Sequence, residues 1–279
     1  MTFSRESLTS NPHRLAVLDV LRGVASFGVC WFHVTNGNVS FLPAGFLKAS
    51  GAYGWLGVEV FFVISGFVIP FALQRARYQI GDCGMFVLKR VARLDPPYFT
   101  TIALIIILGY ASSRAPGFHG EPFSFSMKQT LLHVGYLNAF FGLPWLNPVF
   151  WTLALEFQYY LLMALIFPLV STSLRFRRIG IMLILGILAL AIPAERFVFH
   201  WLLLFLFGIA TFQLKTRIIE RSEYFLCIAM ITCGSLFCYG PTVSLVGLST
   251  AITIAFIEFP NVRPLAFLGR ACEARHLQL

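Results

Sequence analysis

Residues 18–33 read LDVLRGVASFGVCWFH, an apolar run that carries an acid, an arginine and a histidine. At about 100° per residue on a helix, the polar side chains of this run fall on one stripe. The stripe consists of Asp19, Arg22, Ser26, Cys30 and His33. Eleven residues at about 1.5 Å each separate Arg22 from His33 by roughly 16 Å along the helix axis. If Arg22 lies near one membrane surface, His33 is therefore predicted near mid-depth.

Composition places the chain among membrane proteins. Hydrophobic residues make up 58% of the 279 residues and charged residues only 12%, whereas a soluble protein of this size needs a more polar surface. Apolar segments of helix length recur along the chain and predict eight membrane spans. The predicted spans cover about 15–35, 55–74, 97–111, 150–170, 179–193, 198–214, 224–240 and 243–259. The predicted fold is an all-α, polytopic integral membrane helix bundle that forms one domain over residues 1–279.

One further apolar segment, 129–143, is too short to span and contains His133 and Asn138. It is predicted to lie at the membrane surface or to re-enter the membrane. His133 and His200 are expected to be interfacial rather than catalytic. No His, Cys and carboxylate residues have the spacing of a metal site, so neither a metal nor a bound cofactor is predicted.

Lysine and arginine determine the predicted orientation. With the N-terminus in the cytoplasm, sixteen of the 21 basic residues fall in inner segments and four in outer segments, and Arg22 lies within the first span. Both termini are therefore predicted to be cytoplasmic. The net charge of +9 follows from this topology, so that the lipid bilayer is an expected partner and nucleic acid is not.

Charged side chains inside the spans are candidates for function, because a charge in hydrocarbon persists only if it is paired or faces a cavity. Besides Arg22 and His33, the second span contains Glu59 and the fourth contains Glu156. We predict that the two acids approach Arg22 and His33, so that three spans surround one polar cavity. The alternative is a set of structural ion pairs that have no chemical role.

Residues 89–98, KRVARLDPPY, form a predicted cytoplasmic loop that leads into the third span. Arg90 and Arg93 are three residues apart and share a helical face, just before a proline pair. Two guanidinium groups placed in this way can bind phosphates bidentately, which suits a phosphorylated cytoplasmic donor such as an acyl-CoA. The alternative is a purely topological role for these charges.

Four segments, taken in order, resemble the successive signatures of the family 3 membrane acyltransferases. They are DxxRG with Arg22-x10-His33, GVxxFFxxSGF at 57–67, RxxRLxPxY at 90–98 and WTLxxExxYY at 151–160. The resemblance implies a multi-pass enzyme of the bacterial inner membrane. Such an enzyme transfers an acyl group, expected to be acetyl, from cytoplasmic acyl-CoA to a hydroxyl of a polysaccharide, another glycan or a lipid-linked sugar.

By position, the resemblance marks Arg22, His33, Arg90, Arg93 and Glu156 as functional. The candidate catalytic residues are His33, Arg22 and Glu156. The candidate substrate-binding residues are Asp19, Glu59, Ser65, Arg90, Arg93, Tyr98, Trp151 and Tyr160.

The mechanism that we favour uses His33 as a general base. Histidine exchanges a proton near neutral pH, so neutral His33 can accept the proton of an acceptor hydroxyl that attacks the thioester carbonyl. Glu156 would orient the imidazole ring or the acceptor, and Arg22, paired with Asp19, would stabilise the oxyanion or hold the pantetheine end of the donor. The alternative is an acyl-histidine intermediate that carries the group across the membrane.

Two other interpretations remain. A transporter or flippase would use the same polar cavity, although no broken helices occur at matching places in two halves of the sequence. An inactive truncated relative is the second, because residues 271–279 depart from the family pattern. The nineteen residues from Asn261 include charges at 263, 270, 273 and 275, so they are predicted to stay cytoplasmic rather than to span.

Overall fold

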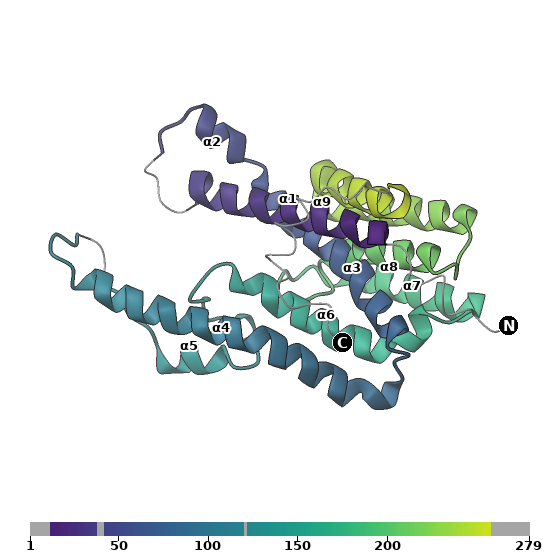
Figure 1. Cartoon of the computed structure of the whole chain (residues 1–279), viewed down its shortest axis with the longest axis horizontal. Coiled ribbons are helices and arrows are strands. Elements are labelled where there is room, and N and C mark those ends of the chain that lie inside the picture. The colour runs from purple at the N-terminus through teal and green to yellow at the C-terminus, as the bar shows by residue number, and fades with distance from the viewer. Residues whose placement is uncertain (1–11, 38–41, 120–121, 258–279) are drawn as a thin grey trace.

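The computed structural model describes residues 12–37, 42–119 and 122–257, and the side chains of these ranges from Ala16 onward (Figure 1). The predicted behaviour of the tail from Asn261 lies outside the described residues. Within them, no strand occurs, which confirms the all-α prediction. The helices are α1 Pro12–Asn36, α2 Phe46–Gly51, α3 Gly57–Arg75, α4 Cys83–Ser113, α5 Met127–Leu132, α6 Phe150–Val170, α7 Arg175–Ala191, α8 Leu202–Lys215 and α9 Arg221–Phe256. Short 3-10 turns cover Gly54–Leu56, Ile80–Asp82 and Asn138–Phe141.

Several helices are suited to cross a membrane, as a polytopic bundle requires. Among the described residues, five segments are long and apolar enough to do so: Ala16–Asn36, Phe46–Arg75, Ile80–Ser113, Phe150–Val170 and Arg221–Phe256. The helices at the fifth and sixth predicted spans, α7 and α8, have only 17 and 14 residues. A straight crossing needs about 20 residues.

The last long helix, α9, consists of two helices that meet at Gly240 and Pro241. Gly240 has a φ of 79°, which glycine adopts without the steric cost that a Cβ would bring, and the chain reverses there. The hydroxyl of Tyr224 lies 3.4 Å from the carbonyl oxygen of Ala251, and the ring of Phe225 stacks on that of Phe256. The two halves of α9 are therefore antiparallel and correspond to the last two predicted spans.

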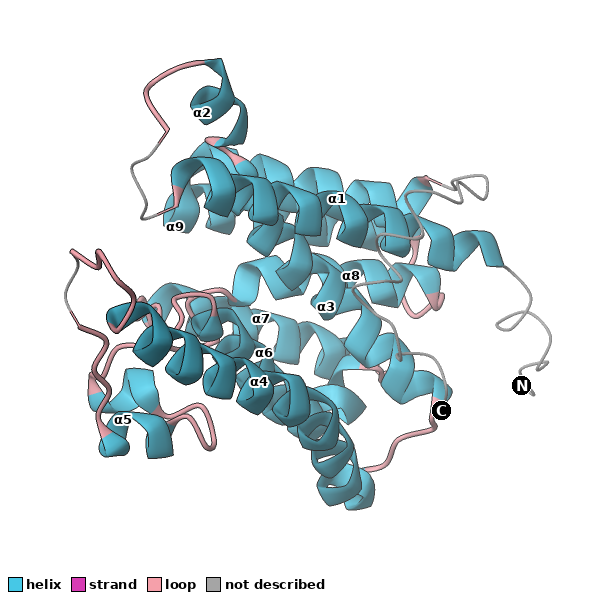
Figure 2. Ribbon diagram, turned by 60° about the vertical axis from the view of Figure 1, so that its left-hand side comes forward, coloured by secondary structure: helices cyan, strands magenta, loops and turns pink. Residues whose placement is uncertain are grey.

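The centre of the bundle is α8, whose residues Leu202–Gln213 are all buried. It packs closely against α3, and Figure 2 shows the two helices side by side. Glycines permit this approach: a Cβ at Gly208 would lie 2.1 Å from the carbonyl oxygen of Val63, and one at Gly66 would lie 2.2 Å from that of Phe205. Small residues at such a crossing let two backbones touch, which favours helix association in a membrane.

The first helix packs against the other face of the same element. A Cβ at Gly54 would lie 2.1 Å from the carbonyl oxygen of Gly28, and one at Gly57 would lie 2.5 Å from that of Ala25. Helix α1 is thereby held antiparallel to the segment that contains α3. Its polar stripe is consequently positioned by backbone contacts rather than by charged groups.

Helix α4 differs from the sequence prediction. It begins at Cys83 and continues to Ser113, whereas the predicted third span began at 97 after a loop. Pro96 and Pro97 lie inside the helix and remove two amide donors, but transmembrane helices tolerate such a loss. The predicted cytoplasmic loop is therefore the first half of a long helix, and Arg90 and Arg93 lie on it.

The connection between α4 and α6 contains no membrane span, in agreement with the prediction for 129–143. It holds α5 and a 3-10 turn, which lie next to α4 along one edge of the bundle (Figure 1). His133 and Asn138 are completely buried there. Nδ1 of His133 lies 2.8 Å from the carbonyl oxygen of Gln129, and the amide of Leu146 donates to Nε2 over 3.3 Å. His133 thus has a structural role, in line with the prediction that it is not catalytic.

Candidate active site

A cavity of about 360 Å³ lies between α1, α3, α4 and the beginning of α6. Its walls are formed by Arg22, Val29, His33, Val58, Phe61, Phe62, Ile64, Ser65, Arg93, Pro148, Val149, Trp151, Thr152 and Glu156. Six of these are residues that the sequence proposed for the site, namely Arg22, His33, Ser65, Arg93, Trp151 and Glu156. The predicted grouping of three spans around one polar cavity is present, and α4 adds a fourth wall.

Helix α1 contributes the basic residues of one wall. Arg22 NH1 lies 4.0 Å from Oδ1 of Asp19, and both side chains are mostly buried. Asp19 itself does not line the cavity. Because α1 runs from Pro12 to Asn36, Arg22 lies near its middle and His33 three residues before its end. The expectation that His33 lies at mid-depth is therefore not supported by these helix bounds, since Arg22 holds the more central position.

Helix α6 contributes Glu156 to the cavity and supports it from behind. The hydroxyl of Tyr160, one turn further along α6, donates a hydrogen bond to Oε1 of Glu156. The guanidinium carbon of Arg90 lies 5.2 Å from the Tyr160 ring centroid and 5.0 Å from that of Phe86. Tyr160 and Arg90, which were expected to bind substrate, do not line the cavity; they form a layer that holds the Glu156 carboxylate.

The two arginines of α4 therefore have different surroundings. Arg93 lines the cavity together with Arg22 and His33, whereas Arg90 packs on the aromatic rings of α4 and α6. Residues three apart on a helix are about 60° apart around its axis, and this is enough to direct the two side chains to different neighbours. The prediction that both arginines bind the donor in the same way is not supported by this geometry.

Two further predicted residues lie away from the cavity. Glu59 is buried, its Oε2 atom has no hydrogen-bond partner, and none of the described residues forms an ion pair with it. The expected pairing of Glu59 with Arg22 or His33 is thus not found. Tyr98 packs against Phe150 and Tyr136, with ring centroids 4.6 and 4.9 Å apart, and belongs to the structural cluster around His133.

The structure adds residues that sequence reasoning did not select. Phe62 forms part of the cavity wall, and its ring lies 6.3 Å from that of Trp151. Thr152 also faces the cavity, which its position four residues before Glu156 indicates in retrospect. Among the described residues, no group of three or more His, Cys, Asp or Glu side chains is placed to hold a metal ion. The site is a set of two arginines, a histidine and a carboxylate against an aromatic wall.

Comparison with known proteins relates this arrangement to a family. The family 3 acyltransferase domain matches residues 15–269. O-acetyltransferase OatA of Staphylococcus aureus is 31% identical over 215 residues, which cover 72% of this chain and 32% of that protein. Peptidoglycan O-acetyltransferase OatA of Listeria monocytogenes is 29% identical over 154 residues, which cover 52% of this chain and 23% of that protein. The matched part is thus about a third and about a quarter of the length of these relatives.

No solved structure matches the chain. The family assignment therefore depends on sequence, and it extends over nearly all of the residues that the structure describes. The resemblance carried by the four motifs is confirmed by this match. This membrane protein belongs to the family 3 acyltransferases.

Proposed function

We propose that this protein is an inner-membrane enzyme that transfers an acyl group, acetyl in the simplest case, from cytoplasmic acyl-CoA to a hydroxyl of a carbohydrate. The observation that carries the proposal is that Arg22, His33, Arg93 and Glu156 line one cavity although they come from three helices. The names of the relatives, O-acetyltransferase and peptidoglycan O-acetyltransferase, support an oxygen acceptor and a polysaccharide.

His33 is the proposed general base. In its neutral form it accepts the proton of the acceptor hydroxyl while the oxygen attacks the thioester carbonyl carbon. The new C–O bond forms, the C–S bond breaks, and the departing thiolate takes the proton from His33, so that CoA leaves as a thiol and the imidazole is regenerated. His33 is well placed for this role because its side chain is exposed and lies on the wall of the cavity.

Glu156 is the proposed orienting group. Its hydrogen bond from Tyr160 holds the carboxylate in one position, and a fixed negative charge there favours the imidazolium that forms during the reaction. Arg22 has the opposite task, because a guanidinium in a partly dry cavity stabilises the negative charge that develops on the carbonyl oxygen. These assignments require no group other than side chains and substrates.

Arg93 is the proposed contact to the anionic part of the donor. It lies on α4 ten residues after the start of that helix, on the side that the predicted topology assigns to the cytoplasm. His33 lies near the end of α1 that the same topology places outside. We therefore propose that the donor reaches the cavity past Arg93 and that the acceptor reaches it at His33.

The exchange His33→Ala tests the proposal in the purified full-length chain. With acetyl-CoA and a polysaccharide as substrates, release of the CoA thiol and acetylation of the acceptor should both fall by about a hundredfold or more. His119→Ala, a change at an exposed position between α4 and α5, is the matched control and should leave both rates unchanged. Substantial transfer by the His33→Ala enzyme would refute the general-base role, and no transfer by the parent protein would favour a transporter.

The alternative covalent route is distinguished by a second measurement. If the acyl group passes through His33, acid quenching of the enzyme with acetyl-CoA in the absence of acceptor leaves an acetylated peptide that contains residue 33. Direct transfer predicts no such peptide and no thiol release in the absence of acceptor. The two routes thus differ in a product that mass spectrometry detects.

A further inference from the structure

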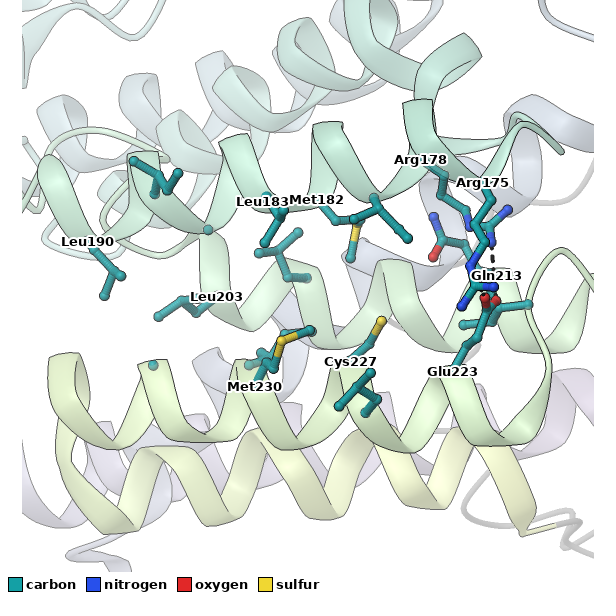
Figure 3. Close-up of a pocket in the computed structure, with 18 residues that line it drawn as sticks. Arg175, Arg178, Met182, Leu183, Leu190, Leu203, Gln213, Glu223, Cys227 and Met230 are labelled. Carbon is teal, nitrogen blue, oxygen red and sulfur yellow. Dashed lines mark hydrogen bonds and ion pairs between the residues drawn. The ribbon is translucent and has the colours of Figure 1, made fainter.

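A second cavity, of about 330 Å³, lies between α7, α8 and α9 and shares no lining residue with the first (Figure 3). Most of its walls are apolar, with Met182, Leu183 and Leu190 on α7 facing Cys227 and Met230 on α9 (Figure 3). Leu183, Leu190 and Met230 are at least half exposed. In a membrane, this groove is open toward the hydrocarbon.

One end of the groove is charged. Arg175 Nε lies 2.8 Å from Oε1 of Glu223, and Arg178 NH2 lies 3.1 Å from Oε2 of the same carboxylate (Figure 3). One acid thus serves two arginines, which leaves an excess positive charge at this end. The side chain of Arg178 is 6% exposed, whereas that of Arg175 is 66% exposed and can reach a ligand. Arg177 and Arg221 begin the same two helices and add further positive charge.

The length of the groove matches one leaflet of a bilayer. From Arg178 to Leu190 it follows α7 for twelve residues, or about 18 Å at about 1.5 Å per residue. Half of a hydrocarbon core of about 30 Å is about 15 Å. The apolar part of the groove is therefore about as long as one extended lipid tail, and its charged end lies where a headgroup would lie.

The middle of the groove is hollow because glycines form part of its wall. A Cβ built on Gly186 would meet no heavy atom within 4 Å, and one on Gly234 would only touch Leu203 at 3.6 Å. The space between α7 and α9 is thus not closed by side chains at this depth. A slender, apolar, unbranched occupant fits such a space.

We propose that this groove binds one acyl chain of an anionic phospholipid, with the phosphate of the headgroup at Arg175. Basic pockets at the cytoplasmic ends of membrane helices attract anionic headgroups, and the predicted topology places the start of α7 on that side. A sugar acceptor does not suit the apolar walls. The site is separate from the catalytic cavity, and the proposal does not depend on the reaction assigned to that cavity.

The headgroup contact is tested by native mass spectrometry of the purified full-length chain. Titration with phosphatidylglycerol and with phosphatidylcholine of the same acyl chains should show about fivefold tighter retention of the anionic lipid, the contribution expected of one basic residue near a charged headgroup. Arg175→Gln should abolish the preference. Arg177→Gln removes the same charge two residues away, outside the groove, and should preserve most of it.

The acyl-chain contact is tested by filling the groove. Gly186→Phe should prevent retention of either lipid, whereas Gly180→Phe should not, since Gly180 also has open space around its Cβ but does not line the groove. Circular dichroism and size-exclusion chromatography establish that both variants are folded. Equal retention of the two lipids by the parent protein, a preference that survives Arg175→Gln, or full retention by folded Gly186→Phe would each overturn the proposal. Arg175 is exposed, so its variant remains decisive if Gly186→Phe does not fold.

Discussion

The guanidinium carbon of Arg90 lies 5.2 Å from the centroid of the Tyr160 ring, and the Tyr160 hydroxyl donates a hydrogen bond to Glu156. A basic motif on α4 and an acidic motif on α6 are therefore one physical unit. Cation–π contacts of partly desolvated arginines contribute about 0.5–2 kcal/mol, and this contact fixes α4 against the helix that carries the carboxylate. Arg90 thus acts on the cavity through Tyr160 rather than by contact with a substrate.

Tyr160→Phe separates the two contacts of that ring. It keeps the aromatic face for Arg90 and removes the hydroxyl that holds Glu156. A hydrogen bond to a charged group contributes about 1.5–3 kcal/mol, so kcat should fall about tenfold or more while the KM for the donor changes little. Steady-state kinetics measure both, with the exposed Tyr53→Phe as the control. An unchanged kcat would show that the position of Glu156 does not depend on Tyr160.

The two arginines of α4 should respond differently to replacement by lysine. Arg93→Lys keeps the charge but removes the planar fork, so we expect the KM for acyl-CoA to rise about tenfold. Arg90→Lys should lower kcat and thermal stability, because it disturbs the packing on Phe86 and Tyr160. Lys89→Gln, at an exposed position on the same helix, is the control. Equal effects of the two arginine exchanges on the donor KM would contradict the separate roles.

The contact between α3 and α8 should be sensitive to a single methyl group. In Gly66→Ala the added Cβ would lie 2.2 Å from the carbonyl oxygen of Phe205, so the two backbones must move apart. Overpacking of this kind costs about 1–3 kcal/mol and should lower the Tm in detergent by several degrees. Gly180→Ala adds the same methyl group where no atom lies within 4 Å, and helix propensity predicts a small gain instead. A stable Gly66→Ala protein would indicate that this helix contact can adjust.

The stability of the protein should decrease in mild acid because of His133. Burial lowers the pKa of His133 below its usual value near 6.5, and Nε2 accepts a hydrogen bond from Leu146, which only the neutral ring can do. As the pH falls below about 6.5, the unfolded state binds a proton that the folded state does not, so the free energy of unfolding decreases. The decrease continues until the folded-state His133 itself becomes protonated.

His133→Gln is the variant that tests this dependence. Its Tm at pH 8 should be lower than that of the parent protein, since the ring packs against Trp145 and Phe150. Between pH 7 and pH 5, however, its Tm should change less. Parallel pH profiles for the two proteins would exclude His133 as the source of the acid sensitivity.

The sequence by itself determined the class of fold, the positions of most helices and the core of the site. The length and apolarity of the segments predict membrane helices, and Gly240 with Pro241 predicts the reversal within α9. Arg22, His33 and Glu156 were predicted to gather because a charge in an apolar segment must face a partner or a cavity. That rule is local, so residue spacing was sufficient to apply it.

Only the tertiary structure decided which neighbour each helix face meets. Spacing placed Arg90 and Arg93 on one face, but their position against α6 sends Arg93 to the cavity and Arg90 to Tyr160. The continuation of α4 through Pro96 and Pro97 was likewise not predicted, since the cost of a proline in a helix depends on its surroundings. The groove at Gly186 exists because three helices meet around it. Residue spacing determines the direction of a side chain from its own helix, whereas the distance to the next helix is set by packing across the whole bundle.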